Sequence, residues 1–257
     1  MNAPASGPLS GLGVIVTRPV RQAAAIATRL ATLGANPIIW PAIVIVPPED
    51  RSALDAVHAR LDAFDVAIFV SANAAEFGAP APSRWPAGLR ILAPGPGTAE
   101  ALAAVGLPGA IVPTTTFDSE GLLALPQLRE VAGKRIAIFR GQDGRELLGE
   151  RLRARGAMVE YVACYRREAP SGDATGLIDT VRDGRAHVLT LTSVEGLDNL
   201  AGAIGPTGVA RFSALKTFAP HPRIVEAARA CGLDAQLTPP GDDGLVAALL
   251  QFAAARA

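Results

Sequence analysis

"ILAPGPGTAEALAAVGL" at residues 91–107 and "KTFAPHPRIVEAARACGL" at residues 216–233 follow the same plan. Each begins with a short apolar run, continues through a proline-containing turn, and ends in a helical segment closed by glycine. The sequence therefore predicts a strand, a turn and a helix that occur twice. At one constant spacing the two stretches share Ala93/Ala219, Pro94/Pro220, Pro96/Pro222, Glu100/Glu226, Ala101/Ala227, Gly106/Gly232 and Leu107/Leu233.

The repetition extends over most of the chain. "VIVTRPVRQAAAIATRLATLGA" (14–35) matches "IAIFRGQDGRELLGERLRARGA" (136–157), and "AIFVSANAAEF" (67–77) matches "VLTLTSVEGL" (188–197). "SEGLLAL" (119–125) parallels "DDGLVAAL" (242–249). Because chance rarely preserves order and element type together, we interpret the sequence as an internal duplication. The matching identities include Arg18/Arg140, Leu30/Leu152, Gly34/Gly156, Ala35/Ala157 and Ser71/Ser193.

Short apolar runs alternate with helical segments in both copies. The runs at 14–16, 68–70, 91–92, 136–139, 188–189 and 217–218 are continuously apolar or nearly so, which is typical of parallel strands buried on both faces. Strands that alternate with helices indicate parallel sheets covered on both sides. The predicted fold class is α/β, with two doubly wound, flavodoxin-like parallel-sheet domains, and an apolar content of 49% can fill both cores.

Two extended runs, 37–48 and 159–170, are long for strands of small sheets, and Pro41 interrupts the first. We interpret both as crossings between the domains. Domain 1 would then be discontinuous, with residues 1–40 plus 168–257, and domain 2 would span 44–163. A simple tandem division near residue 130 is the alternative.

Composition limits the partners. Lys plus Arg and Asp plus Glu both number 24, so no net charge attracts nucleic acid or a membrane surface. The two cysteines and three histidines are scattered, which predicts no metal site and a reducing compartment. The N-terminal stretch lacks a secretory pattern, and the longest apolar run is too short to span a bilayer. We therefore expect a cytoplasmic monomer.

Polar and small residues follow the predicted strands, where parallel sheets bind ligands with loop N–H groups and helix N-termini. The same residues have simpler interpretations: Ser71, Thr98 and Ser193 suit helix caps, the arginines suit solvated surface groups, and Gly141 suits a turn. "GQDGRE" lacks the Gly-Lys-Ser/Thr end of a phosphate-binding loop, which disfavours a nucleotide cofactor. The predicted ligand-binding residues are Arg18, Ser71, Asn73, Thr98, Arg140, Gly141, Thr192, Ser193 and Arg223.

Several of these motifs together resemble the uroporphyrinogen-III synthase family. The most specific part runs from "RG-x-x-GRE-x-L" at residue 140 to "Y-x-x-x-YRR" at residue 161, and "FVSANA", "GPGTAEAL" and "LTSVEGLDNL" add to it. The resemblance implies two parallel α/β lobes joined by two extended strands, with a cleft between them. It implies that hydroxymethylbilane, a linear tetrapyrrole, is cyclised to uroporphyrinogen III with inversion of the last pyrrole ring, loss of water and no cofactor.

The resemblance also implies a proton donor. Tyr165 matches the tyrosine of the family's interdomain strand, and a phenol can protonate the departing hydroxyl. Packing at the crossing is the alternative for Tyr165 and the favoured role for Tyr161. The chain departs from the family pattern at Val70, which replaces a hydroxyl residue, and at 220–223, which reads Pro-His-Pro-Arg. A two-lobed binding protein without catalytic activity is the other function that these loops would serve.

Overall fold

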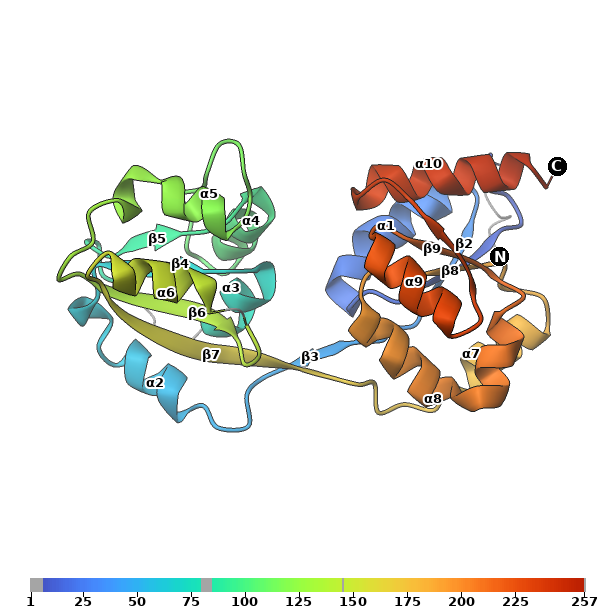
Figure 1. The fold of residues 1–257 in the computed structure, drawn as a ribbon, viewed down its shortest axis with the longest axis horizontal. Coiled ribbons are helices and arrows are strands. Elements are labelled where there is room, and N and C mark those ends of the chain that lie inside the picture. The colour runs from blue at the N-terminus through green and yellow to red at the C-terminus, as the bar shows by residue number, and fades with distance from the viewer. Residues whose placement is uncertain (1–6, 80–84, 145, 257) are drawn as a thin grey trace. The chain divides into compact units, whose positions relative to one another are not determined.

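The computed structural model describes residues 7–79, 85–144 and 146–256, which form two compact units. Unit 1 comprises Met1–Val44 and Glu168–Ala257, and unit 2 comprises Ile45–Arg167. The chain thus passes from one unit to the other twice. Each unit contains one five-stranded sheet (Figure 1).

The sheet of unit 1 has the order β10-β9-β8-β1-β2, and all neighbouring strands are parallel. Apolar residues without alternation form its centre: Val14, Ile15 and Val16 of β1 are at most 1% exposed. Such strands must be covered on both faces. The strands are β1 (Gly13–Val16), β2 (Asn36–Ile39), β8 (Val188–Thr190), β9 (Lys216–Ala219) and β10 (Asp234–Leu237).

Helices cover both faces of this sheet (Figure 1). α1 (Val20–Thr32) and α10 (Gly241–Ala254) pack against Val14 and Val16. Ile15 points the other way, as alternate residues of a strand do, into a core built from α7 (Thr175–Arg182), α8 (Val194–Phe212) and α9 (Pro222–Ala230). The unit is therefore doubly wound.

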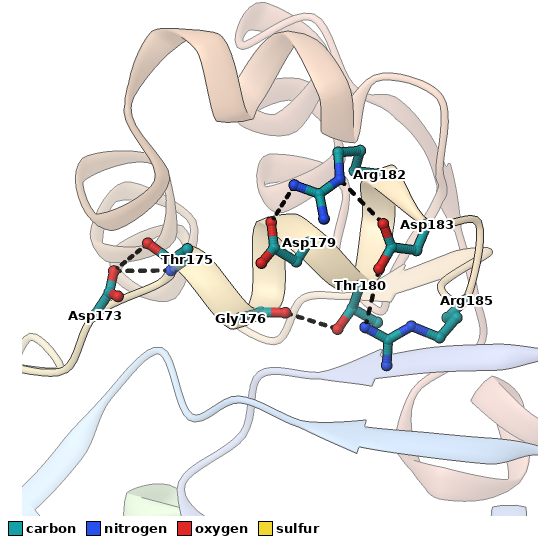
Figure 2. Close-up of polar contacts among 8 residues, drawn as sticks. All are labelled: Asp173, Thr175, Gly176, Asp179, Thr180, Arg182, Asp183 and Arg185. Carbon is teal, nitrogen blue, oxygen red and sulfur yellow. Dashed lines mark hydrogen bonds and ion pairs between the residues drawn. The ribbon is translucent and has the colours of Figure 1, made fainter.

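Local polar contacts hold the short helix α7 at both ends (Figure 2). The Asp173 carboxylate accepts hydrogen bonds from the Thr175 hydroxyl at 2.7 Å and from its N–H at 2.9 Å, and these bonds lower the pKa of Asp173. Arg182 forms ion pairs with Asp179 at 2.7 Å and Asp183 at 3.0 Å. A helix of eight residues is marginal alone, so these contacts and its buried face stabilise it together.

The sheet of unit 2 has the order β3-β7-β6-β4-β5, and the pairings among β7, β6, β4 and β5 are parallel. A bridge between Leu92 and Ile111 extends it beyond β5. The stacked rings of Phe69 and Phe139, 4.4 Å apart, form the centre of one face. The strands are β3 (Val44–Val46), β4 (Val66–Phe69), β5 (Arg90–Leu92), β6 (Arg135–Gly141) and β7 (Met158–Glu168).

Helices also cover both faces of the second sheet. α2 (Ser52–His58), α3 (Ala72–Gly78) and α4 (Pro96–Ala104) lie on the Phe139 face, while α5 (Ser119–Ala124) and α6 (Leu147–Ala154) lie on the opposite face. Two short 3₁₀ helices, Leu61–Ala63 and Pro126–Leu128, complete the unit. The predicted α/β class with parallel sheets is confirmed, and each predicted apolar run coincides with a strand, although Val70 lies one residue beyond β4.

The two extended runs differ from each other. Within 37–48, β2 belongs to the first sheet and β3 to the second. The run at 159–170 is mostly β7, which has eleven residues and lies in the second sheet alone, and no strand follows it until β8. The length of β7 therefore comes from its place in the sheet, where it pairs along the full length of β6.

Candidate functional site

In unit 2, the carboxyl ends of β4, β6 and β7 bring together three of the predicted site residues. Ser71 follows β4 and caps α3, since its Oγ accepts the Ala74 N–H at 3.1 Å. The cap interpretation of Ser71 is therefore confirmed. The same Oγ lies 3.3 Å from the Tyr165 hydroxyl, so the serine also has a polar contact outside its helix.

Tyr165 lies where β7 slips against β6. The register shifts between Arg140 and Gly141, which places Gly141 opposite Tyr165. A Cβ on Gly141 would lie 2.8 Å from the phenol ring carbon Cζ, so only glycine allows this approach. Tyr165 is 4% exposed and belongs to the apolar core of the unit. The packing role is thus realised, and the hydroxyl group is the polar end of a buried side chain.

A small hollow of about 30 Å³ borders Tyr165, lined also by residues 141–144 and by Arg166 and Arg167. Another cavity of about 730 Å³ lies at the opposite edge of the sheet, next to Val66 and Arg90 at the amino ends of β4 and β5. Since parallel sheets bind ligands at their carboxyl ends, the small hollow is the one that coincides with the predicted site.

Arg140 does not extend away from the protein. It is 8% exposed, and its guanidinium donates from Nε to the Gly141 carbonyl at 3.2 Å and from Nη2 to the Gly144 carbonyl. Its Cζ lies 4.4 Å from the centroid of the Tyr161 ring, a cation–π distance. The guanidinium of Arg140, which the sequence predicted to bind a ligand, is therefore directed toward residues 141–144 of the loop that follows it.

Asn73 and Thr98 lie in the first turns of their helices. Asn73 is half-buried in α3, and its side chain makes no hydrogen bond with any residue that the structure describes. Thr98 is 8% exposed and is the third residue of α4, whose N-cap is Gly95. The cap interpretation of Thr98 is wrong, because the chain enters this helix two residues earlier, at Pro96.

In unit 1, Arg18 follows β1 and forms an ion pair with Asp242 in the first turn of α10. A cap at Asp242, which its residue type favours, is not formed, since α10 begins at Gly241. Sequence reasoning missed this pair because the two residues are 224 positions apart. The arginine therefore has a carboxylate partner within its own unit.

The remaining unit 1 residues follow β8 and β9. Ser193 caps α8, since its Oγ accepts the Gly196 N–H at 2.9 Å, and Thr192 beside it is exposed. Arg223 is exposed in the first turn of α9, and its N–H donates to Nδ1 of His221 at 3.2 Å. These donors are accessible at the carboxyl edge of their sheet.

Cys164 precedes Tyr165 but offers no nucleophile. Burial raises the pKa of its thiol to about 12, and its Sγ lies 3.3 Å from the Arg140 carbonyl oxygen. Within the described residues, no three His, Cys, Asp or Glu side chains are grouped as a metal site requires. None of the described helices is both long and apolar enough to cross a bilayer.

Comparison with known proteins agrees with the motifs. The protein-family model described as "Uroporphyrinogen-III synthase HemD" matches residues 24–247. The uroporphyrinogen-III synthase of Salmonella typhimurium is 36% identical over 189 residues, which cover 72% of this chain and 76% of the relative. That of Synechococcus elongatus is 30% identical over 233 residues, which cover 86% and 87%.

Solved structures show the same fold. Uroporphyrinogen-III synthetase from Helicobacter pylori superposes with a TM-score of 0.60 at 12% identity, over 96% of this chain and 99% of that one. A mutant uroporphyrinogen III synthase from Thermus thermophilus gives a TM-score of 0.56 at 20% identity, over 96% and 100%. Since the family model spans most of the sequence, the chain belongs to the uroporphyrinogen-III synthase family.

Proposed function

We propose that this chain is a uroporphyrinogen-III synthase, which cyclises hydroxymethylbilane to uroporphyrinogen III with inversion of ring D and loss of one water. The match of residues 24–247 to the family carries this proposal. The contact between Ser71 and Tyr165 supports it, because it places two hydroxyl groups at the carboxyl edge of a parallel sheet. The reaction needs no cofactor.

Substrate binding relies on local donors, since the net charge of the chain is zero. The substrate carries eight carboxylates, and each charge-assisted hydrogen bond contributes about 1.5–3 kcal/mol. In unit 2 we propose Asn73 and the N-terminal turn of α4 at Thr98 as donors. In unit 1 we propose Thr192, Ser193 and Arg223. Arg18 is a weaker candidate, because Asp242 already offsets its charge.

We propose Tyr165 as the source of the proton that the leaving hydroxyl needs. Its 4% exposure restricts direct contact with a substrate, whereas Ser71 is half-exposed and 3.3 Å away. Ser71 would protonate the leaving oxygen as the C–O bond breaks, and Tyr165 would reprotonate Ser71. The pyrrole ring that forms the new C–C bond then loses a proton, which restores the phenol and leaves water as the net product.

Positioning decides which isomer forms. The azafulvene left after water departs closes spontaneously to the uninverted isomer, so the enzyme must hold the ring ends for attack at the substituted carbon, through a spiro intermediate. The test is to incubate the purified chain with freshly generated hydroxymethylbilane and separate the type I and type III products by chromatography. Type III product is expected, and type I alone would reject the proposal.

The alternative is a two-lobed protein that binds the tetrapyrrole but does not catalyse its cyclisation. Such a protein would bind hydroxymethylbilane and leave the isomer ratio at its spontaneous value. The same chromatographic assay, run beside a binding titration, separates the two functions. A ratio unchanged by a binding-competent protein would favour the alternative.

We also infer that the two units are copies of one ancestral unit. In the sequence repeat, strands β7, β6, β4 and β5 of unit 2 are the counterparts of β2, β1, β8 and β9 of unit 1, and the bridge at Ile111 is the counterpart of β10. The two sheets therefore have the same order of equivalent strands. β3 is then an addition at one edge. A cytoplasmic location and a monomeric state belong to the same proposal, and sedimentation at several concentrations tests the second.

A further inference from the structure

We infer that Arg140 is a positioning residue that holds loop 141–144 against Tyr165 and does not bind a substrate carboxylate. This inference rests on the proposed function, since it assigns how the loop acts on the same site. Arg140 lies in the most specific part of the family motif, and its positive charge would suit binding of a substrate carboxylate. Its contacts indicate another role.

The first contact closes the loop. Arg140 donates to the carbonyls of Gly141 and Gly144, so its fork spans the loop from its first residue to its last described one. A Cβ on Gly144 would lie 2.7 Å from Nε of Arg140, which explains why glycine occupies this position. Backbone carbonyls thus use donors that a carboxylate would need.

The second contact is between the guanidinium of Arg140 and the ring of Tyr161. The centroid of the Tyr161 ring lies 4.4 Å from Cζ of Arg140 and 4.9 Å from Cζ of Arg153, both cation–π distances. The Tyr161 hydroxyl donates to the Glu146 carbonyl at 2.7 Å, just before α6. A Cβ on Gly149 would lie 2.2 Å from that hydroxyl oxygen, so Tyr161 can occupy this position only because residue 149 is glycine. Tyr161 therefore connects Glu146, the residue before α6, to β7.

The third contact connects the loop to the reacting pair. The Gln142 N–H donates to the Tyr165 carbonyl at 2.9 Å, and Gly141 lies against the phenol ring. A displaced loop would move the surface on which the phenol rests, and with it the hydroxyl beside Ser71. The duplicated arginine in unit 1, Arg18, is bound instead to a carboxylate, so the two copies have diverged.

Two readouts test the role of Arg140. The first is hydrogen exchange of the Gln142 and Gly144 amides, which needs no activity. Arg140→Lys keeps the charge and removes the fork, and we expect at least tenfold faster exchange at these amides, with the same effect in Tyr161→Leu. Arg151→Lys, an exposed arginine on α6, is the matched control and should leave exchange unchanged. Unchanged exchange in Arg140→Lys would overturn the inference.

The second readout is the split between kcat and KM for type III formation. A positioning role predicts that Arg140→Lys lowers kcat at least tenfold and raises the type I fraction, with KM within about twofold of the original value. Gly144→Ala should reproduce this pattern, because its methyl group displaces the guanidinium and leaves the charge of Arg140 in place. A KM increase of tenfold or more with kcat preserved, together with normal kinetics in Gly144→Ala, would identify Arg140 as a substrate ligand and refute the inference.

If the unmodified chain forms only type I product, the proposed function fails, and the exchange experiment still decides whether Arg140 holds the loop. Thermal unfolding of each variant controls for loss of fold. Should Tyr161→Leu not fold, Tyr161→Phe removes only the bond to the Glu146 carbonyl and is expected to accelerate exchange at Gly144 more than twofold. No acceleration in that variant would contradict the part assigned to Tyr161.

Discussion

The contact between Ser71 and Tyr165 makes a prediction that combines stability with catalysis. Tyr165→Phe removes the phenol hydroxyl, Ser71→Ala removes its partner, and the double variant removes both. Ser71→Thr is the matched control, since it keeps a hydroxyl group and a residue suited to an N-cap. If protons pass from the phenol through the serine, the two single variants should lose the same catalytic step.

The structure sets the size of each effect. The O···O distance of 3.3 Å exceeds the usual 2.7–2.8 Å of such bonds, so we expect the contact to contribute about 0.5 kcal/mol to the unfolding free energy, at the low end of the usual range. Ser71→Ala also loses the cap on Ala74 and should be destabilised by about 1.5 kcal/mol in all. Proton transfer by a positioned side chain contributes about 10²–10⁴-fold, so each single variant should lose at least about 10²-fold in kcat.

The assay measures type III formation from fresh hydroxymethylbilane and, separately, urea unfolding of the original chain and the four variants. A relay predicts that the double variant is no slower than the slower single variant, since either loss interrupts the same transfer. Losses that multiply would show two independent roles. A folded Tyr165→Phe protein that forms type III product within about threefold of the original rate would refute proton donation by Tyr165.

Three further predictions concern the rest of the chain. Iodoacetamide at pH 8 should label Cys231, which is exposed, and spare Cys164, whose pKa is raised by burial to about 12, with mass spectrometry as the measurement; two labels on the folded chain would contradict this. Burial lowers the pKa of His187 below 6.5, and its Nδ1 accepts the Gly13 N–H. As the pH falls, the unfolded chain therefore binds a proton at this histidine before the folded chain does. The unfolding free energy should then decrease below about pH 6.5, by at most about 1.4 kcal/mol per pH unit. His187→Asn, which keeps an acceptor, should flatten that slope in urea titrations at pH 5–7, and an unchanged slope would exclude this histidine as its cause. Gly202→Ala, in an exposed part of α8 with no atom within 4 Å of the added methyl group, should raise the unfolding free energy by about 0.5–1 kcal/mol in the same assay, whereas a decrease would show that the helix needs glycine there.

Local chemistry made part of the structure predictable from the sequence. Apolar runs such as 14–16 identify buried strands because burial on both faces leaves no alternation. Ser71 and Ser193 could be identified as caps because capping involves residues three positions apart. The position of Thr98 inside its helix was missed, because the proline two residues earlier starts the helix first.

The directions of long side chains could not be predicted in this way. Arg18 and Arg140 occupy equivalent positions in the sequence repeat, yet one contacts Asp242 and the other its own loop and Tyr161. Each direction depends on a partner from a later element of the chain: Asp242 lies in α10, and Tyr161 lies in β7. Periodicity and residue type contain no information on that choice. The strand register pairs Arg140 with Ala163, and Tyr161 lies two residues earlier on β7, so the contact between Arg140 and Tyr161 follows only from the three-dimensional structure.

The discontinuity of unit 1 has a consequence for biosynthesis. β1 pairs with β8, and Val14 lies opposite Val188, so this unit cannot complete its sheet until most of the chain has left the ribosome. Unit 2 is continuous from Ile45 to Arg167 and can fold as soon as its last strand emerges. The apolar surface of the nascent N-terminal segment, including β1 and α1, must then wait for its partners, which makes it the segment most in need of protection by a chaperone during synthesis.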